Sequence, residues 1–174
     1  MTDHHSRAAV AFAMFRNKPL SLEIRQFLAR AIKRADVRPK YIICDKDRIF
    51  GKSFKAWCRN KHKIVLRYGA VGQHGSIAVI ERFFRSIKNE WLQKIIVPLR
   101  LSQMRQIVET YARWYNHYRP HQGLGGATPI EIYGRNITSS KKSCFDPKRE
   151  KLILVMKFLD KHRQLPVVEL KKVA

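Results

Sequence analysis

Three short apolar runs, separated by segments with a helical pattern, are the feature that most constrains how this chain folds. The runs are AAVAFAMF (8–15), YIIC (41–44) and KIVLRY (63–68), and each has the length of a buried strand. Apolar residues recur at helical spacing over 20–32, and residues 51–60 carry a second, shorter helical pattern. Strands that alternate with helices predict parallel pairing through crossover connections. We therefore expect an α/β fold with a short, mostly parallel sheet of three strands, flanked by helices and open at one edge.

Two longer helical patterns follow the third run, after a glycine-rich loop at 69–75. The first extends from Ser76 to about Lys94, with a core stripe of Ile77, Ile80, Phe84, Ile87 and Trp91. The second begins after Pro98 with Ser102 as its expected N-cap, and it is expected to bury Ile107, Val108, Tyr111, Trp114 and Tyr115. Both helices are expected to pack through these stripes.

The end of the chain has a different composition. Residues 134–149 form a basic linker, and two apolar stretches lie within 152–170, where the pattern does not separate helix from strand. The sequence therefore divides into a core, 1–133, and a basic linker with a C-terminal segment, 134–174.

A strong positive charge extends along the whole chain. There are 36 Lys and Arg against 13 Asp and Glu, which gives a formal net charge of +23. Such a charge attracts polyanions, most readily nucleic acid. Charge alone does not distinguish DNA, RNA and an anionic membrane surface, but no RNA-binding signature accompanies it.

The apolar runs and the cysteines also indicate the cellular compartment of the protein. No run approaches the roughly 20 residues of a membrane span, and the first residues do not form a signal peptide, so we expect a cytoplasmic protein without membrane association. The three cysteines, Cys44, Cys58 and Cys144, are widely spaced and lack a C-x-x-C motif. They indicate reduced thiols, and neither they nor His117 and His121 predict a zinc site.

Acidic residues are scarce in this chain, so the two that lie beside apolar runs are candidates for a functional site. Asp45 directly follows the YIIC run, at the strand end where sites form in parallel sheets, and Glu81 lies in AVIERFF, just after the glycine-rich loop. Carboxylates collected on a strand end and a facing helix are suited to Mg²⁺ or Mn²⁺ and to two-metal phosphoryl transfer. The alternative for Glu81 is an ordinary surface ion pair with Arg85.

Cations accompany Glu81 on its helix. Arg85 and Lys88 share its face, and we expect Arg82, Arg85 and Lys88 to contact DNA phosphates. Arg119, in the segment YNHYRPHQGLGGATP, is a further candidate, although this segment is also expected to end the last helix and pack on the core.

Several of these stretches together resemble the integrase-core (DDE-type) transposases of bacterial insertion sequences, which are related to retroviral integrases. The matching segments are DHHSR, IICDKDRIFGKSFKAWC, GAVGQHGSIAVIERFFRSIKNEW and ARWYNHYRPHQGLGGATPIEIY, within residues 3–133. The resemblance implies a ribonuclease-H-like fold and a catalytic triad of two aspartates and a glutamate. It also implies 35 residues between the second aspartate and the glutamate, and Asp45 and Glu81 have this separation.

The resemblance also shows departures. Asp47 stands where the family usually has glycine, and we expect it to be a solvated turn residue rather than an aid to the metal site. Asp3 lies in DHHSR, which matches a segment beyond the family's first catalytic strand, so Asp3 is not expected to be the first acid of the triad. On this basis we expect an N-terminally truncated core that begins after that strand.

The resemblance implies metal-dependent strand transfer that joins mobile-element DNA to target DNA, in a bacterial, nucleoid-associated protein. The alternative is a truncated transposase that binds DNA without turnover, which the missing first acid favours for this chain alone. A homo-oligomer, or pairing with an intact transposase, is the expected assembly.

Overall fold

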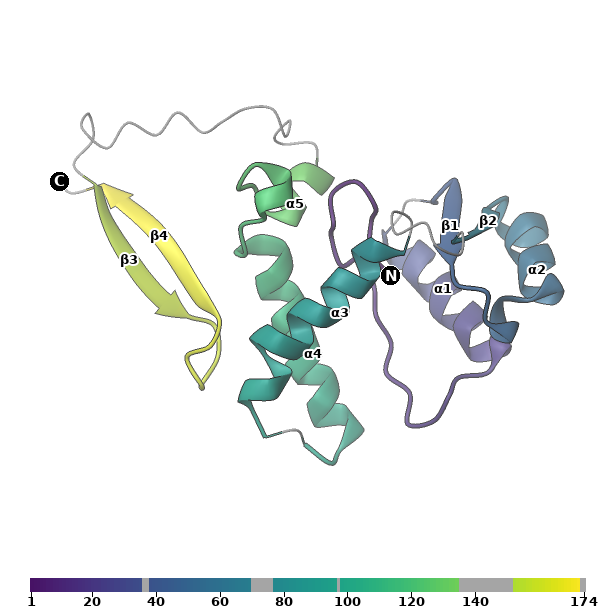
Figure 1. Cartoon of the computed structure of the whole chain (residues 1–174), viewed down its shortest axis with the longest axis horizontal. Coiled ribbons are helices and arrows are strands. Elements are labelled where there is room, and N and C mark those ends of the chain that lie inside the picture. Colours follow the sequence, from purple (N-terminus) through teal and green to yellow (C-terminus); the bar gives the residue numbers. More distant parts are fainter. Residues whose placement is uncertain (36–37, 70–76, 97, 135–151, 173–174) are drawn as a thin grey trace. The chain divides into compact units, whose positions relative to one another are not determined.

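The computed structural model describes residues 1–35, 38–69, 77–96, 98–134 and 152–172 (Figure 1). The chain forms two compact units. Unit 1 contains Met1 and residues 10–82, and unit 2 contains residues 2–9 and 83–174. The expected boundary between a core ending at 133 and a C-terminal segment stays a prediction, and residues 135–151 lie outside the described part.

Unit 1 contains the predicted parallel strand pair. Its elements are helix α1 (Ser21–Ala35), strand β1 (Tyr41–Cys44), the 3-10 turn η1 (Arg48–Phe50), helix α2 (Lys52–His62) and strand β2 (Val65–Tyr68). β1 and β2 pair in parallel, with Tyr41 opposite Val65 and Cys44 opposite Tyr68. A helix therefore connects two parallel strands, as the alternating pattern predicts.

The core of unit 1 is formed by apolar residues from its helices and strands. The fully buried members are Leu28, Phe54, Cys58, Ile64 and Leu66. Ile42 and Cys44 of β1 are partly buried against this cluster, whereas Tyr41 and Ile43, which alternate with them, are exposed. The strand expected at 41–44 is present but only half-buried, because one of its faces contacts the core.

The prediction of a strand at 8–15 is also wrong. In this run only an isolated bridge between Thr2 and Ala9 occurs. The backbone groups of the run find other partners: the N–H groups of Val10 and Ala11 donate to the Met1 carbonyl, and Ala9 bonds with the Asn116 side chain. Since these contacts replace a strand ladder, the described parallel sheet has two strands rather than three.

Unit 2 is mainly helical. It contains most of α3 (Ala78–Glu90), the short turn η2 (Leu92–Lys94), the long helix α4 (Leu101–His117), the turn η3 (Gln122–Leu124) and helix α5 (Pro129–Tyr133). Ring contacts join Phe83 of α3 to Tyr111 and Tyr115 of α4, and Tyr111 to Trp114. This aromatic cluster packs α3 against α4.

Two details of the helical predictions are wrong. Phe84 is exposed, and its neighbour Phe83 is buried in its place together with Ile87 and Trp91. Ile87 and Trp91 are buried as expected, so the stripe keeps its direction and contains Phe83 in place of Phe84. In α4, Arg100 rather than Ser102 is the N-cap, because the helix already begins at Leu101.

The C-terminal segment is a β-hairpin, which settles the ambiguity of its sequence pattern. Strands β3 (Leu152–Phe158) and β4 (Pro166–Lys172) pair antiparallel. The Trp114 indole N–H donates to the Pro166 carbonyl at 2.7 Å, and Leu165 and Val167 are buried. The hairpin is therefore anchored to α4 within unit 2.

Candidate functional site

Asp45 lies at the carboxyl end of β1 and is exposed. Within the described part of the chain its carboxylate has no hydrogen bond or ion pair, so its oxygens are accessible to a ligand. The preceding Cys44 is a free thiol. Burial, aided by the charge of Asp45, raises the pKa of the Cys44 thiol to about 12. At neutral pH the Cys44 thiol is therefore protonated, and it donates to the Arg67 carbonyl at 3.8 Å.

Asp47, two residues further, has a structural role. Its side chain accepts from the Ile49 N–H at 3.0 Å and so caps η1, and it forms an ion pair with Lys18 at 2.7 Å. The hydrogen bond from Lys18, then that from Ile49, lowers the pKa of the Asp47 carboxyl. These contacts confirm Asp47 as a turn residue.

Glu81 lies in the first turn of α3, on an exposed part of the helix. The glycine-rich loop that precedes this helix, 69–75, lies almost wholly outside the described residues. Among the described residues Glu81 forms no ion pair, with Arg85 or with another cation. The alternative of an ordinary Glu81–Arg85 surface pair is therefore not realised in this structure.

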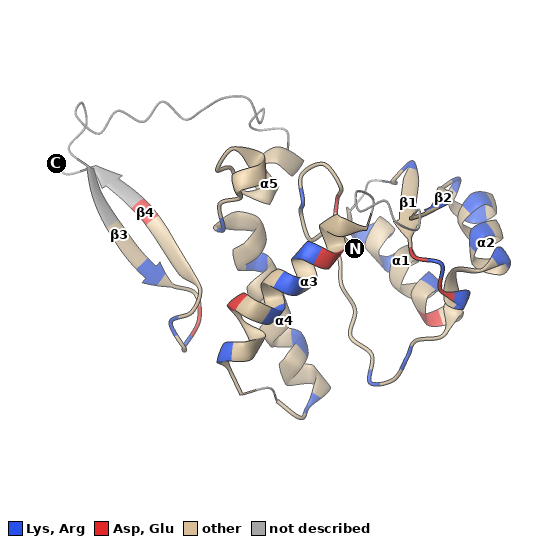
Figure 2. Cartoon of the chain, viewed as in Figure 1, with Lys and Arg blue, Asp and Glu red and all other residues tan. Residues whose placement is uncertain are grey.

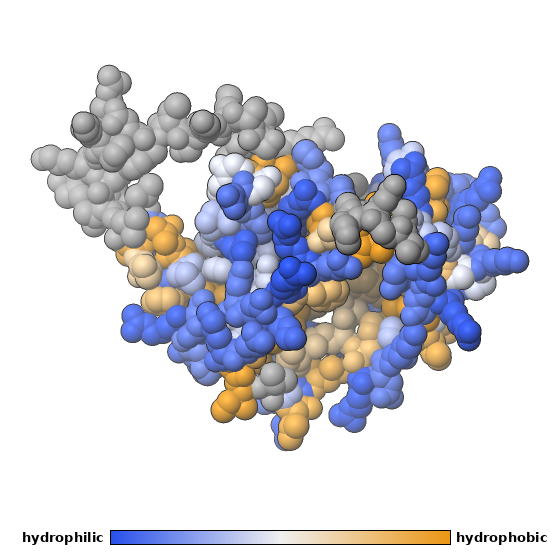
Figure 3. Space-filling model, viewed as in Figure 1, coloured by the Kyte–Doolittle hydropathy of each residue, from blue (hydrophilic) through white to orange (hydrophobic). Residues whose placement is uncertain are grey.

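The basic residues of α3 are also exposed. Figure 2 shows basic positions along this helix, and the surface over it is strongly hydrophilic (Figure 3). Arg82, Arg85 and Lys88 are all exposed. Because residues three and four apart are neighbours on a helix, Arg85 and Lys88 extend from Glu81 along one face. Their contact with DNA stays a prediction.

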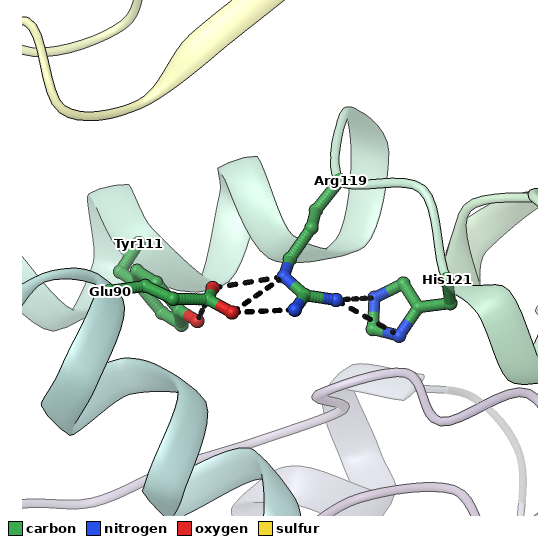
Figure 4. Close-up of polar contacts among 4 residues, drawn as sticks. All are labelled: Glu90, Tyr111, Arg119 and His121. Carbon is green, nitrogen blue, oxygen red and sulfur yellow. Dashed lines mark hydrogen bonds and ion pairs between the residues drawn. The ribbon is translucent and has the colours of Figure 1, made fainter.

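Arg119, in contrast, is held within the protein. Its guanidinium bonds with the Glu90 carboxylate through Nε, at 2.9 and 3.2 Å, and through Nη2 (Figure 4). The Tyr111 hydroxyl donates to the same carboxylate at 2.8 Å. Contact of Arg119 with DNA also stays a prediction, and these bonds favour its other expected role, in packing after the last helix.

The network around Arg119 ends at His121, whose two ring nitrogens each lie 3.4 Å from Arg119 Nη1 (Figure 4). Burial, followed by the charge of Arg119, lowers the pKa of His121 to about 4. Burial also opposes the charge of Arg119, but its bonds with Glu90 outweigh this effect and raise its pKa. The network thus combines a charged pair with a neutral histidine at neutral pH.

Asp3 is engaged in a turn of its own. Its Oδ2 accepts from the Ser6 N–H at 2.8 Å and from the Ser6 hydroxyl at 2.7 Å, and Ser6 is buried. The Asn116 side chain anchors the same segment through two bonds with the Ala9 backbone. These contacts give Asp3 a structural role within unit 2.

The two predicted metal ligands have suitable chemistry, since both are exposed carboxylates, the oxygen donors that Mg²⁺ and Mn²⁺ prefer. In the part of the chain that the structure describes, no group of three or more His, Cys, Asp or Glu residues is placed to hold a metal ion.

Within the described residues no helix is long and apolar enough to cross a membrane.

Glu81 and both members of the Glu90–Arg119 pair fall within a segment that matches one protein family. Residues 62–129 match the integrase core domain. The matched segment extends from the end of α2 to the start of α5, so it includes Glu81, Arg85, Lys88 and Arg119 but not Asp45. No curated protein matches the chain. An integrase core domain indicates DNA integration or transposition, with DNA as the partner.

The role of Glu90 was not predicted from the sequence. Tyr111 was expected in the core and Arg119 near the end of the last helix, but the acid that binds both lies 29 residues before Arg119. The sequence feature that could have predicted the Glu90–Arg119 pair is the small number of acids, because each acid is then a candidate partner for an arginine in a half-buried segment.

Proposed function

We propose that this chain acts on mobile-element and target DNA by metal-dependent strand transfer, through a ribonuclease-H-like core of the kind found in transposases of bacterial insertion sequences. The observation that carries the proposal is the integrase core match over 62–129, which contains an exposed Glu81 followed by exposed cations on the same helix. A net charge of +23 supports a polyanionic substrate.

Asp45 and Glu81 are the residues that would hold Mg²⁺ or Mn²⁺. When bound, such ions supply positive charge that stabilises the attacking and leaving oxygens in phosphoryl transfer. Arg85 and Lys88 hold DNA phosphates beside Glu81, and Arg82 adds a further contact. Asp3 is not assigned as the first acid of the triad, because its carboxylate is bonded to Ser6 in its own turn.

The second candidate function is DNA binding without turnover, by this chain alone or in an assembly with another copy. The observation that favours it is the charge, which supports DNA binding whether or not the metal site is complete. Among the described residues no third acid, His or Cys joins a group that could hold a metal ion, and a two-metal reaction needs its full set of carboxylates, so this candidate predicts little strand transfer.

The deciding experiment is a strand-transfer assay with labelled DNA ends and a plasmid target, in Mg²⁺ or Mn²⁺. Asp45→Asn and Glu81→Gln are compared with Glu109→Gln, which removes an exposed glutamate from α4. Joining that is lost in the first two variants and kept in the third supports strand transfer. DNA binding without joining supports the second candidate, and a chain that neither binds nor joins DNA contradicts both.

A further inference from the structure

Phe84 is a large aromatic side chain that α3 holds in solvent. Its exposed fraction is 61%, whereas that of the adjacent Phe83 is 5%. The two rings contact each other with centroids 6.0 Å apart and planes at 61°. The Phe84 ring therefore packs against a buried ring, while most of its own surface remains exposed to solvent.

The charges around Phe84 restrict what can cover it. Arg85 is the next residue and Lys88 lies one turn further along the same face, and both are exposed. A second copy of a chain with a net charge of +23 is repelled from such a surface, whereas a polyanion is attracted to it. The charge thus favours nucleic acid as the occupant.

The helix also holds Phe84 in a fixed position. Phe83, Ile87 and Trp91 are buried and fix α3 in the core of unit 2, and Glu90 is bonded to Arg119 and Tyr111. A ring on a rigid element loses little conformational freedom when it binds, and this favours a specific contact over a transient one.

We propose that Phe84 stacks on an unpaired nucleobase of DNA whose phosphates are held by Arg85 and Lys88. Exposed aromatic rings beside cations are the usual means of binding unpaired bases, because every base has a face on which a ring stacks. Phe84 then selects DNA with an opened end over a fully paired duplex. This inference rests on the proposed function for DNA as the partner, but it does not depend on metal chemistry.

The test compares two DNAs of the same length without divalent metal. One is a blunt duplex, and the other has a few mismatched pairs at one end, with 2-aminopurine at an unpaired position. Fluorescence anisotropy gives the affinity for each DNA, and 2-aminopurine emission reports stacking. The variants are Phe84→Ala, Phe84→Leu and Phe84→Trp, with Leu99→Ala as the control, since Leu99 is an apolar residue with an exposed fraction of 99%.

The wild-type chain is expected to prefer the opened end by about fivefold or more and to quench its 2-aminopurine. Phe84→Ala and Phe84→Leu lose both effects, Phe84→Trp keeps them, and Leu99→Ala resembles wild type. Circular dichroism verifies that each variant is folded, which the exposure of Phe84 leads us to expect.

Three results overturn the inference. These are a preference that persists in Phe84→Ala, a preference that Phe84→Leu retains in full, and a Phe84 substitution that alters only self-association in light scattering. The two hypotheses fail in different ways. If the chain does not join DNA in the strand-transfer assay, strand transfer is excluded, but the preference for opened ends is still observed. Conversely, failure of this inference leaves salt-dependent binding to duplex DNA intact.

Discussion

At the scale of single residues, Glu81 has a favourable position for a charged ligand site. It lies in the first turn of α3, where the helix dipole stabilises a carboxylate, and it is exposed and has no ion-pair partner among the described residues. Asp45, at the end of β1, is also exposed and has no hydrogen bond or ion pair with any described residue. Both side chains can therefore bind a cation without first breaking a bond within the described part of the protein.

The first prediction concerns metal affinity. Asp45→Asn and Glu81→Gln each remove one anionic oxygen ligand, so each is expected to weaken Mn²⁺ binding by at least about tenfold. Isothermal titration calorimetry measures the change, and Glu109→Gln is the matched control. Equal Mn²⁺ affinity in the wild type and both variants would show that these carboxylates are not ligands.

The second prediction concerns acid stability at His121. Its pKa is about 4 in the folded protein, against an ordinary value of 6.5, because of burial and then the charges of Arg119 and Arg7; a Tyr115 backbone bond and Glu90 act in the opposite direction. As the pH falls below 6.5 the unfolded chain takes up the proton first, so the neutral histidine's contribution to stability is lost progressively between pH 6.5 and about 4.

Urea unfolding at a series of pH values tests this linkage. The loss of stability between pH 7 and pH 4 is expected to be smaller in His121→Gln, which cannot titrate, than in the wild type. His162→Gln, at an exposed histidine, is the control for changing a histidine as such. If the His121→Gln curve parallels that of the wild type, His121 does not titrate on unfolding in this range.

At the scale of elements, the Glu90–Arg119 pair joins the end of α3 to the segment after α4. The two side chains are 32% and 24% exposed, so the pair is only partly screened by water. The Tyr111 hydroxyl donates to the same carboxylate from within α4. Three parts of unit 2 thus meet at one carboxylate, and this restrains the helix that carries Phe84, Arg85 and Lys88.

The third prediction is that Glu90→Gln destabilises unit 2. The change leaves Arg119 half-buried without its counter-charge, which is expected to cost about 1–3 kcal/mol of the free energy of unfolding. Chemical denaturation followed by tryptophan fluorescence measures this cost, because Trp114 belongs to the same unit. Glu109→Gln, on the exposed face of α4, is expected to change stability by no more than about 0.5 kcal/mol. Equal effects of the two substitutions would show that the pair is not stabilising.

At the scale of the whole molecule, positive charge is the dominant property. The excess of Lys and Arg over Asp and Glu occurs in both units, as the colours of Figure 2 indicate, and most of the cations in the described part of the chain are exposed. A protein of this kind binds DNA largely through phosphate contacts and the release of counterions.

The fourth prediction is a steep dependence of DNA affinity on salt. A plot of log K against log salt concentration, from fluorescence anisotropy, is expected to become less steep by about 2 in the double variant Arg85→Gln/Lys88→Gln, since each lost phosphate contact lowers the slope by about 1. Arg105→Gln/Arg113→Gln removes the same charge from exposed positions on α4. If both double variants change the slope equally, the face of α3 has no special part in binding DNA.

The local elements, and the side chains available to them for chemistry, follow from the amino-acid sequence. Apolar spacing predicted α1 and α4 and the parallel pair β1–β2, because a helix or strand that buries one face shows this in its period. It also singled out Asp45 and Glu81, since charged groups beside apolar runs are unusual in a chain with few acids. These features are local, so neighbouring residues suffice to specify them.

The contacts between distant segments, in contrast, depend on how the chain packs in three dimensions. Residues 8–15 have the composition of a strand, yet their backbone bonds with Met1 and Asn116, and a partner 107 positions away is invisible to a local pattern. Phe83 is buried instead of Phe84 because Tyr111 and Tyr115 face it, and Arg119 is paired because Glu90 lies beside it. Pairings of this kind depend on the packing of distant segments, which the period of a single segment does not encode.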